Sequence, residues 1–372
     1  MQIGGWDSEL TGMYVAKFEA GFPEGNNDTT SKKSSQIYTQ SVAYVGATEA
    51  GMTDISVQTA RNWLDGIYGE TEMKISYPVF QPLTYSMNYI NINDIYNICR
   101  AMNEEGNIYG FTISTSDTHL MKNSEWGMVS YLSYSKYGTN GQKIATNNAN
   151  LNSGGSNRTV STGKNGVDSV YGITGMTDGT TNGEETVVKI EEIRTLRGNT
   201  PTATGRMYAW NQKEGVVASS TRNVTGVYDL SGGLWERTAS YVANNHNNLL
   251  INGKSMTYEK DILKTISTKY SMVYAHDSSI DDITKPITDE NLNAASKANY
   301  QKNNIFGDAI KETSILGTST NSWEDDYSIF SGLNSIFFSR GGSFGGKGRF
   351  SFNGDSGDSY FVIDFRAIVI PI

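Results

Sequence analysis

The segment "RGGSFGGKGRFSFNGDSGDSYFVIDFR", residues 340–366, constrains the fold of this chain most strongly. The glycines after Arg340 predict a tight or bulged backbone turn, because glycine adopts conformations that other residues avoid. The following "YFVIDFRAIVI" alternates with the period of a strand, which predicts one strand with a common face. The residues expected on that face are Phe361, Ile363, Phe365, Ala367 and Val369. We therefore expect a loop that the fold holds at both ends.

The N-terminal "GMYVAKFE", residues 12–19, alternates in the same way. It predicts a half-buried strand with Tyr14, Ala16 and Phe18 on one face and Lys17 and Glu19 on the other.

Two segments have the spacing of helices that pack on a core. "NDIYNICRAMNEEG" starts at Asn93 as a cap, places apolar residues on one stripe and stops at Gly106. "NSEWGMVSYLSYSKYG" starts at Asn123 or Ser124 and stops at Gly138.

Two insertions interrupt this pattern. Residues 139–205 are rich in Asn, Gly, Thr and Ser, which predicts a long surface insertion with a few short strands. Residues 241–300 contain "TYEKDILKTISTKY" and "TDENLNAASKANY", both expected to be short amphipathic helices, the second capped by Thr288. The whole chain, 1–372, is interpreted as a single decorated domain of the α+β class.

The amino-acid composition argues against several classes of function. A net charge of −9 disfavours binding to nucleic acid, and no apolar run approaches the length that spans a bilayer. The first residues lack a signal-peptide pattern, so any export or anchoring signal is expected outside this chain. The one cysteine, Cys99, permits no internal disulfide, and His119, His246 and His276 are scattered rather than clustered.

Three motifs follow one another along the chain: "HLMKNSEWGMVSYL" (119–132), "GVYDLSGGLWERT" (226–238) and "SRGGSF" with "DFR" (339–344 and 364–366). In this order they resemble the formylglycine-generating-enzyme type of the C-type-lectin-like fold. The resemblance implies a core of two short helices and short twisted strands that carries long irregular insertions. It covers the chain from about Gly12 to the C-terminus, interrupted by the two insertions.

The residues of these motifs are suited to structural roles. Asp229 and Ser231 can bond backbone amides, while Gly232 and Gly233 form a turn that aims Trp235 inward. The arginines at 340 and 366 can clamp carbonyls or carboxylates. Structural roles are expected for Glu125, Trp126, Trp235, Glu236, Arg340 and Arg366.

Enzymatic functions find little support in the residues. The family that this chain resembles includes oxidases that hold copper with a cysteine pair. The C-terminal half of this chain has no cysteine. "GGSFGGKG" lacks the pattern of a phosphate-binding loop, and no nucleophile elbow accompanies the three histidines. We therefore expect that the protein is not an enzyme and that it binds no cofactor. Structural calcium remains an alternative without a location: "NGDSGDSYFVID" offers oxygen donors but departs from the EF-hand pattern.

The C-terminal segment instead has the composition of a binding surface, in which tyrosine and small polar residues predominate. The candidate ligand-binding residues are Phe344, Lys347, Arg349, Phe352, Asn353, Asp355, Ser356, Asp358, Ser359 and Tyr360. The resemblance implies that this is the segment randomised in variable proteins of diversity-generating retroelements. That mutagenesis acts on AAY codons and cannot introduce Lys, Glu, Gln, Met or Trp, and residues 348–372 contain none of these. A solvated loop between two strands is the plain alternative.

The sequence therefore predicts a non-enzymatic ligand-binding or adhesion protein on a virion or bacterial cell surface. Its partner would be a protein or carbohydrate surface ligand, with homo-oligomers as an open alternative. A structural decoration or assembly protein of a phage or pilus is the second reading. A divergent enzyme of the formylglycine-generating-enzyme superfamily is the third.

Overall fold

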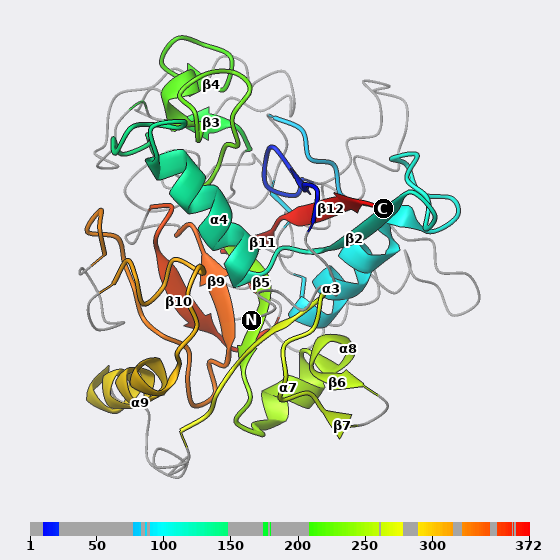
Figure 1. Ribbon diagram of the computed structural model, residues 1–372, viewed down its shortest axis with the longest axis vertical. Coiled ribbons are helices and arrows are strands. Elements are labelled where there is room, and N and C mark those ends of the chain that lie inside the picture. Colours follow the sequence, from blue (N-terminus) through cyan, green and yellow to red (C-terminus); the bar gives the residue numbers. More distant parts are fainter. Residues whose placement is uncertain are drawn as a thin grey trace, which may run out of the picture.

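The computed structural model describes residues 10–21, 77–82, 86–87, 90–147, 174–177, 179, 208–259, 262–277, 289–314, 322–342, 348–358, 360 and 362–372. Most of the Asn-rich insertion therefore lies outside the described residues, except for its first residues, 139–147, and a short piece at 174–177 and 179. The described part is a mixed α+β structure with short helices around several sheets (Figure 1). This confirms the α+β class that the sequence predicted.

A strand of eight residues, β5 (Trp235–Val242), organises the larger sheet. On one side it pairs antiparallel with β9 (Phe337–Arg340), which in turn pairs with β10 (Phe352–Asp355). On its other side it pairs in parallel with β11 (Ile363–Phe365) and, further along, with β8 (Met272–Tyr274). All eight residues of β5 are buried, as expected of a strand covered on both faces.

The smaller sheet has the order β1 (Tyr14–Val15), β12 (Ala367–Pro371) and β2 (Ser116–Leu120), with antiparallel pairing throughout. Two further pairs stand apart from it: β3 (Met176–Thr177) with β4 (Tyr208–Ala209), and β6 (Tyr258–Glu259) with β7 (Ile262–Leu263). The segment that the sequence predicted as one C-terminal strand is thus two strands, β11 and β12, in different sheets. Arg366 stands between them, and its side chain is buried at the junction.

Both core helices form close to where their sequences predicted them. The first, α3 (Ile92–Arg100), is capped by Asn91 rather than Asn93 and continues into a 3-10 turn, Ala101–Asn103. The second, α4 (Asn123–Tyr134), begins after Lys122. Gly127 allows a close approach on α4, because a Cβ there would lie 2.3 Å from the Gly307 carbonyl oxygen.

The second insertion follows its sequence prediction only in part. The helix predicted over 288–300 is confirmed as α9 (Asp289–Lys302), although Thr288 lies outside the described residues. The prediction of a helix over residues 257–270 is wrong. The short helix α8 (Lys254–Thr257) ends where the predicted helix would begin, and the paired strands β6 and β7 follow it. The segment is rich in β-branched Thr and Ile, which favour extended backbone when tertiary contacts allow it. The remaining short elements are α7 (Asn247–Ile251) and a 3-10 turn, Val216–Ala218.

The N-terminal strand also departs from its predicted faces. Tyr14, expected inside, is 69% exposed, while Glu19, expected outside, is fully buried. The strand ends at Val15, so the two-residue alternation does not continue to Glu19. Phe18 is buried as predicted and stacks on Tyr228 at 5.2 Å between ring centroids.

No helix among the described residues is long and apolar enough to cross a membrane.

Candidate binding surface

The start of the C-terminal segment is anchored by Arg340, whose side chain is completely buried. Its guanidinium donates to the carbonyl oxygens of Asp308 at 2.9 Å, Ala309 at 3.1 Å and Ser351 at 3.0 Å. Gly341 follows with a φ of +80°, and the Trp126 ring lies 3.3 Å from where its Cβ would be. The predicted turn and the predicted carbonyl clamp are both confirmed.

A hydrogen bond joins the backbone on the two sides of residues 343–347. The Gly348 amide donates to the Gly341 carbonyl at 3.1 Å, and residues 343–347 between them lie outside the described residues. A Cβ on Gly348 would lie 2.0 Å from the Asp326 carboxylate, so no side chain fits at this position.

Two of the candidate ligand contacts are core residues instead. Arg349 is fully buried and pairs with Glu324, while donating to Ser133 Oγ at 2.7 Å and to the Gln142 carbonyl at 2.8 Å. Phe352 is also fully buried, because β10 turns its ring into an aromatic cluster that includes Phe330 and Phe338. Neither side chain has surface left for a ligand, so the prediction for these two residues is corrected.

The middle of the segment is held by a second buried arginine, Arg237 on β5. Its Nε and Nη2 lie 2.8 and 2.7 Å from Asp355 Oδ1, and Nη2 also donates to the Asp358 carbonyl. Burial raises the pKa of Asp355, while the adjacent Arg237 charge opposes this shift. Asp355 therefore positions the backbone from within. The sequence analysis missed Arg237, although it directly follows the motif residues Trp235 and Glu236.

The side chains that remain available point to solvent between these anchors. Asp358 is exposed and Tyr360 is 44% exposed, while Asn353 and Ser356 are half-buried. Phe344, Lys347 and Ser359, which were also candidates, lie outside the described residues.

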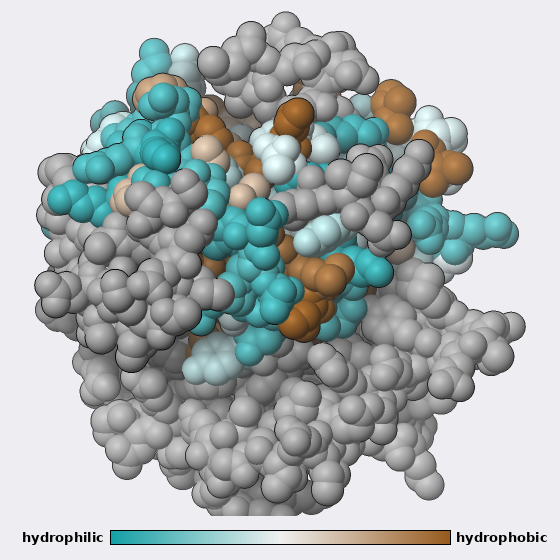
Figure 2. Space-filling model, turned by 90° about the horizontal axis from the view of Figure 1, so that it is seen from below, coloured by the Kyte–Doolittle hydropathy of each residue, from teal (hydrophilic) through white to brown (hydrophobic). Residues whose placement is uncertain are grey.

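Helix α7 adds apolar surface beside this segment. Asn252, directly after α7, donates its side-chain amide to the Ser356 carbonyl at 2.9 Å. The preceding Leu250 and Ile251 are 47% and 67% exposed, and sequence reasoning did not select them. Figure 2 views the molecule from the end where α7 lies in Figure 1, and there the described hydrophobic residues form small groups among hydrophilic ones.

Arg366 anchors the end of the segment. Its Nη2 and Nε pair with both carboxylate oxygens of Glu236 at 2.6 and 2.8 Å. The same guanidinium donates to the carbonyls of Ala16 at 2.6 Å and Tyr228 at 2.9 Å. A single buried side chain thus ties together the two sheets and the turn before β5.

Three more buried carboxyl groups surround this pair: Glu19, Asp229 and Asp364. Burial, followed by the mutual repulsion of Glu19 and Asp364, raises the pKa of Glu19 well above its usual range. Burial likewise raises the pKa of Asp364 well above its usual range, with the Glu236 charge adding to the shift. The shared burial of Glu19 and Asp364 therefore favours the neutral form of both carboxyl groups.

The turn before β5 is shaped to receive this cluster. A Cβ on Gly233 would lie 1.7 Å from Glu19 Oε1, and Leu234 donates its amide to that oxygen at 3.0 Å. Asp229 accepts the Gly175 amide at 2.9 Å and the Asn147 side-chain amide at 2.9 Å. Asp229 thus binds two described pieces of the Asn-rich insertion, at Asn147 and Gly175, rather than its own neighbours.

The metal and catalytic alternatives are not supported by the arrangement of their residues. Of the calcium donors considered, Asp355 is paired with Arg237, and Asp364 is buried on β11. Among the described residues, no group of three or more His, Cys, Asp or Glu could hold a metal ion. Cys99 is buried, and burial raises the pKa of its thiol, which opposes formation of a reactive thiolate.

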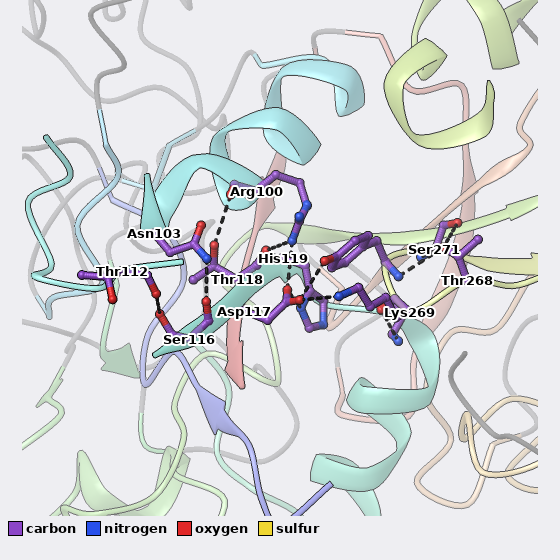
Figure 3. A network of polar contacts seen from close by, with 12 residues as sticks. Arg100, Asn103, Thr112, Ser116, Asp117, Thr118, His119, Thr268, Lys269 and Ser271 are labelled. Atoms are coloured by element: carbon purple, nitrogen blue, oxygen red, sulfur yellow. Dashed lines mark hydrogen bonds and ion pairs between the residues drawn. The ribbon is translucent and has the colours of Figure 1, made fainter. Parts of the chain in front are cut away.

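His119 belongs to a buried polar network on β2 (Figure 3). Its Nε2 lies 2.8 Å from Glu125, whose pKa is lowered because the charges of His119 and Lys122 outweigh the effect of burial. Nearby, Asp117 accepts from Lys269 at 2.8 Å and from Arg100 at 2.9 Å. These contacts join β2 to α3, α4 and the segment before β8, so the network has a structural role.

No family model matches the chain, and no curated protein matches its sequence.

Proposed function

We propose that this protein is a non-enzymatic ligand-binding protein of the C-type-lectin-like fold, with a C-terminal segment that forms the binding surface. The supporting observation is the contrast between anchored backbone and outward side chains. Arg340, Arg237 and Arg366 fix the segment from inside, while Asp358 and Tyr360 reach solvent. A fixed backbone lowers the entropy cost of binding, and exposed tyrosine supplies contact area.

We further propose display on a virion or bacterial cell surface. The resemblance of the three motifs to variable proteins supports this setting, and the partner would be a protein or carbohydrate on another surface. The segment can change its outward residues without loss of the anchors, as a receptor-binding protein requires.

Replacing Tyr360 and Asp358 together by alanine should weaken adhesion by at least about 30-fold, the effect of losing one aromatic hot spot. The labelled protein would be titrated onto intact cells of a panel of bacterial strains, and bound fluorescence measured. The melting temperature should stay unchanged, because neither side chain is buried.

The matched control is Tyr14→Ala, which removes a 69% exposed tyrosine from β1 in the other sheet. It should bind like the unaltered protein. Equal adhesion of the double variant and the unaltered protein would refute the proposed surface. Ordered oligomers without any added cell or ligand would favour the assembly function instead.

If the segment is diversified, variation among naturally occurring copies of the gene should follow burial. Codons for Asn353, Ser356, Asp358 and Tyr360 should vary, while those for Arg349 and Phe352 should stay constant, because changes in the core destabilise the fold. Sequencing the gene and its neighbourhood in related isolates tests this. Equal variation at the buried and exposed positions would contradict it.

A further inference from the structure

A short turn outside the C-terminal segment presents a large aromatic side chain to solvent. Burial alternates along it: Ser322, Glu324 and Asp326 are buried, whereas Trp323 and Asp325 are exposed. The Asp325 amide donates to the Ser322 carbonyl at 3.2 Å, which closes the turn. Trp323 is 51% exposed, although burial of its side chain would be favourable.

The inward residues of the turn fix its backbone. Glu324 pairs with the buried Arg349, and Asp326 accepts the Phe350 amide at 3.0 Å. Asp325 has a φ of +59°, a left-handed conformation that aspartate and asparagine tolerate better than most residues. The contacts of its buried residues therefore hold the turn in one conformation.

Three aromatic rings fix the orientation of Trp323. Its ring centroid lies 5.4 Å from Tyr134, 5.9 Å from Tyr131 and 5.5 Å from Phe350. The interplanar angles of 49°, 63° and 65° show that these rings meet it at an inclination rather than in a parallel stack. A ligand would thus meet a rigid indole that loses little rotamer freedom on binding.

Polar groups of both kinds lie on the turn itself and on the segment that contacts it. Asp325 is an exposed hydrogen-bond acceptor two residues away. Lys143 donates its ammonium to the Glu324 carbonyl, and Gln142 beside it is exposed. The turn and this segment therefore offer acceptors and donors, and the Lys143 charge next to the turn disfavours a cationic ligand.

We propose that Trp323 and Asp325 form a binding site for a pyranose ring of a glycan. A pyranose has an apolar face of C–H groups that can stack on the indole, and hydroxyl groups at its rim that donate to a carboxylate. The site requires no metal ion. It uses a different segment from the C-terminal surface and does not rest on the function proposed for that surface.

The test is a calorimetric titration of the full chain with four soluble hexasaccharides: β-linked N-acetylglucosamine, β-linked glucose, α-linked glucose and α-linked mannose. At least one should bind saturably and alter tryptophan emission. Trp323→Ala should weaken that binding by at least about 30-fold, the loss expected for a tryptophan hot spot. Asp325→Asn should weaken it by about tenfold, because a charged acceptor is lost while the left-handed backbone is tolerated.

Asp325→Asn also keeps the test decisive if Trp323→Ala disturbs the aromatic cluster and lowers the melting temperature. The surface control is Tyr137→Ala, which removes a 76% exposed tyrosine and should bind normally. The proposal is overturned if none of the four sugars binds at millimolar concentration, or if Asp325→Asn and Trp323→Ala bind as well as the unaltered chain. Saturable binding of tetramethylammonium in place of the sugars would overturn it as well. Tyr360→Ala separates the two sites, because it should not affect sugar binding.

Discussion

An Arg366→Ala variant is expected to lose about 3–5 kcal/mol of folding free energy, the range for removing one partner of a buried ion pair. The guanidinium is fully buried, pairs with both Glu236 oxygens and donates to the carbonyls of Ala16 and Tyr228. Its removal leaves a buried carboxylate and two carbonyl groups without a donor. Urea denaturation followed by circular dichroism measures the loss.

Three further variants show whether the ion pair itself accounts for this loss of folding free energy. Arg366→Lys should lose less, because it keeps the charge but cannot bond both oxygens and both carbonyls. The double variant Arg366→Met with Glu236→Leu should be more stable than Arg366→Ala, since the Glu236 carboxylate is no longer left without its partner. Lys213→Ala, at an exposed position, should change stability by less than about 0.5 kcal/mol. An Arg366→Ala variant as stable as the unaltered chain would refute this role.

The protein should be more stable at pH 5 than at pH 9, the reverse of the usual dependence for buried acids that are ionised. Burial raises the folded-state pKa of Glu19 and Asp364 well above the unfolded values near 4. The stability they contribute is fully present below the unfolded pKa and is lost as the pH rises through the folded pKa. Each pH unit in that window lowers stability by about 1.4 kcal/mol per protonated group. Urea midpoints measured from pH 5 to 9 test this.

Asp364→Asn should flatten this pH dependence, because the amide cannot ionise while its oxygen can still accept the Phe365 amide. The matched control is Asp358→Asn, an exposed aspartate near the same strand, which should leave the slope unchanged. Stability that rises with pH in the unaltered chain, or an unchanged slope in Asp364→Asn, would contradict the raised pKa values of Glu19 and Asp364.

The sequence allowed correct prediction of features that depend on nearby residues. The turn at Gly341 follows from glycine conformation, and α3, α4 and α9 follow from apolar spacing, although the caps of α3 and α4 are Asn91 and Lys122 rather than the predicted residues. The inward structural roles of Trp126, Glu236, Arg340 and Arg366 are likewise confirmed. The C-type-lectin-like identity of the fold stays a proposal.

Features that depend on distant partners could not be predicted. Arg349 resembles a surface residue in a glycine-rich loop, and its burial depends on Glu324 and on residues near the end of α4. Glu19 is buried because Gly233, more than 200 positions later, leaves space for its carboxyl group. The break between β11 and β12 arises from the contacts of Arg366, which alternation of apolar residues does not reveal.

The position of β12 between β1 and β2 has a consequence for biosynthesis. The smaller sheet cannot pair until residues 367–371 have left the ribosome, since β12 is its central strand. Until then β1 and β2 have no partner in this sheet, and such long-range pairing slows folding. A nascent chain arrested before residue 367 should therefore be protease-sensitive at β2.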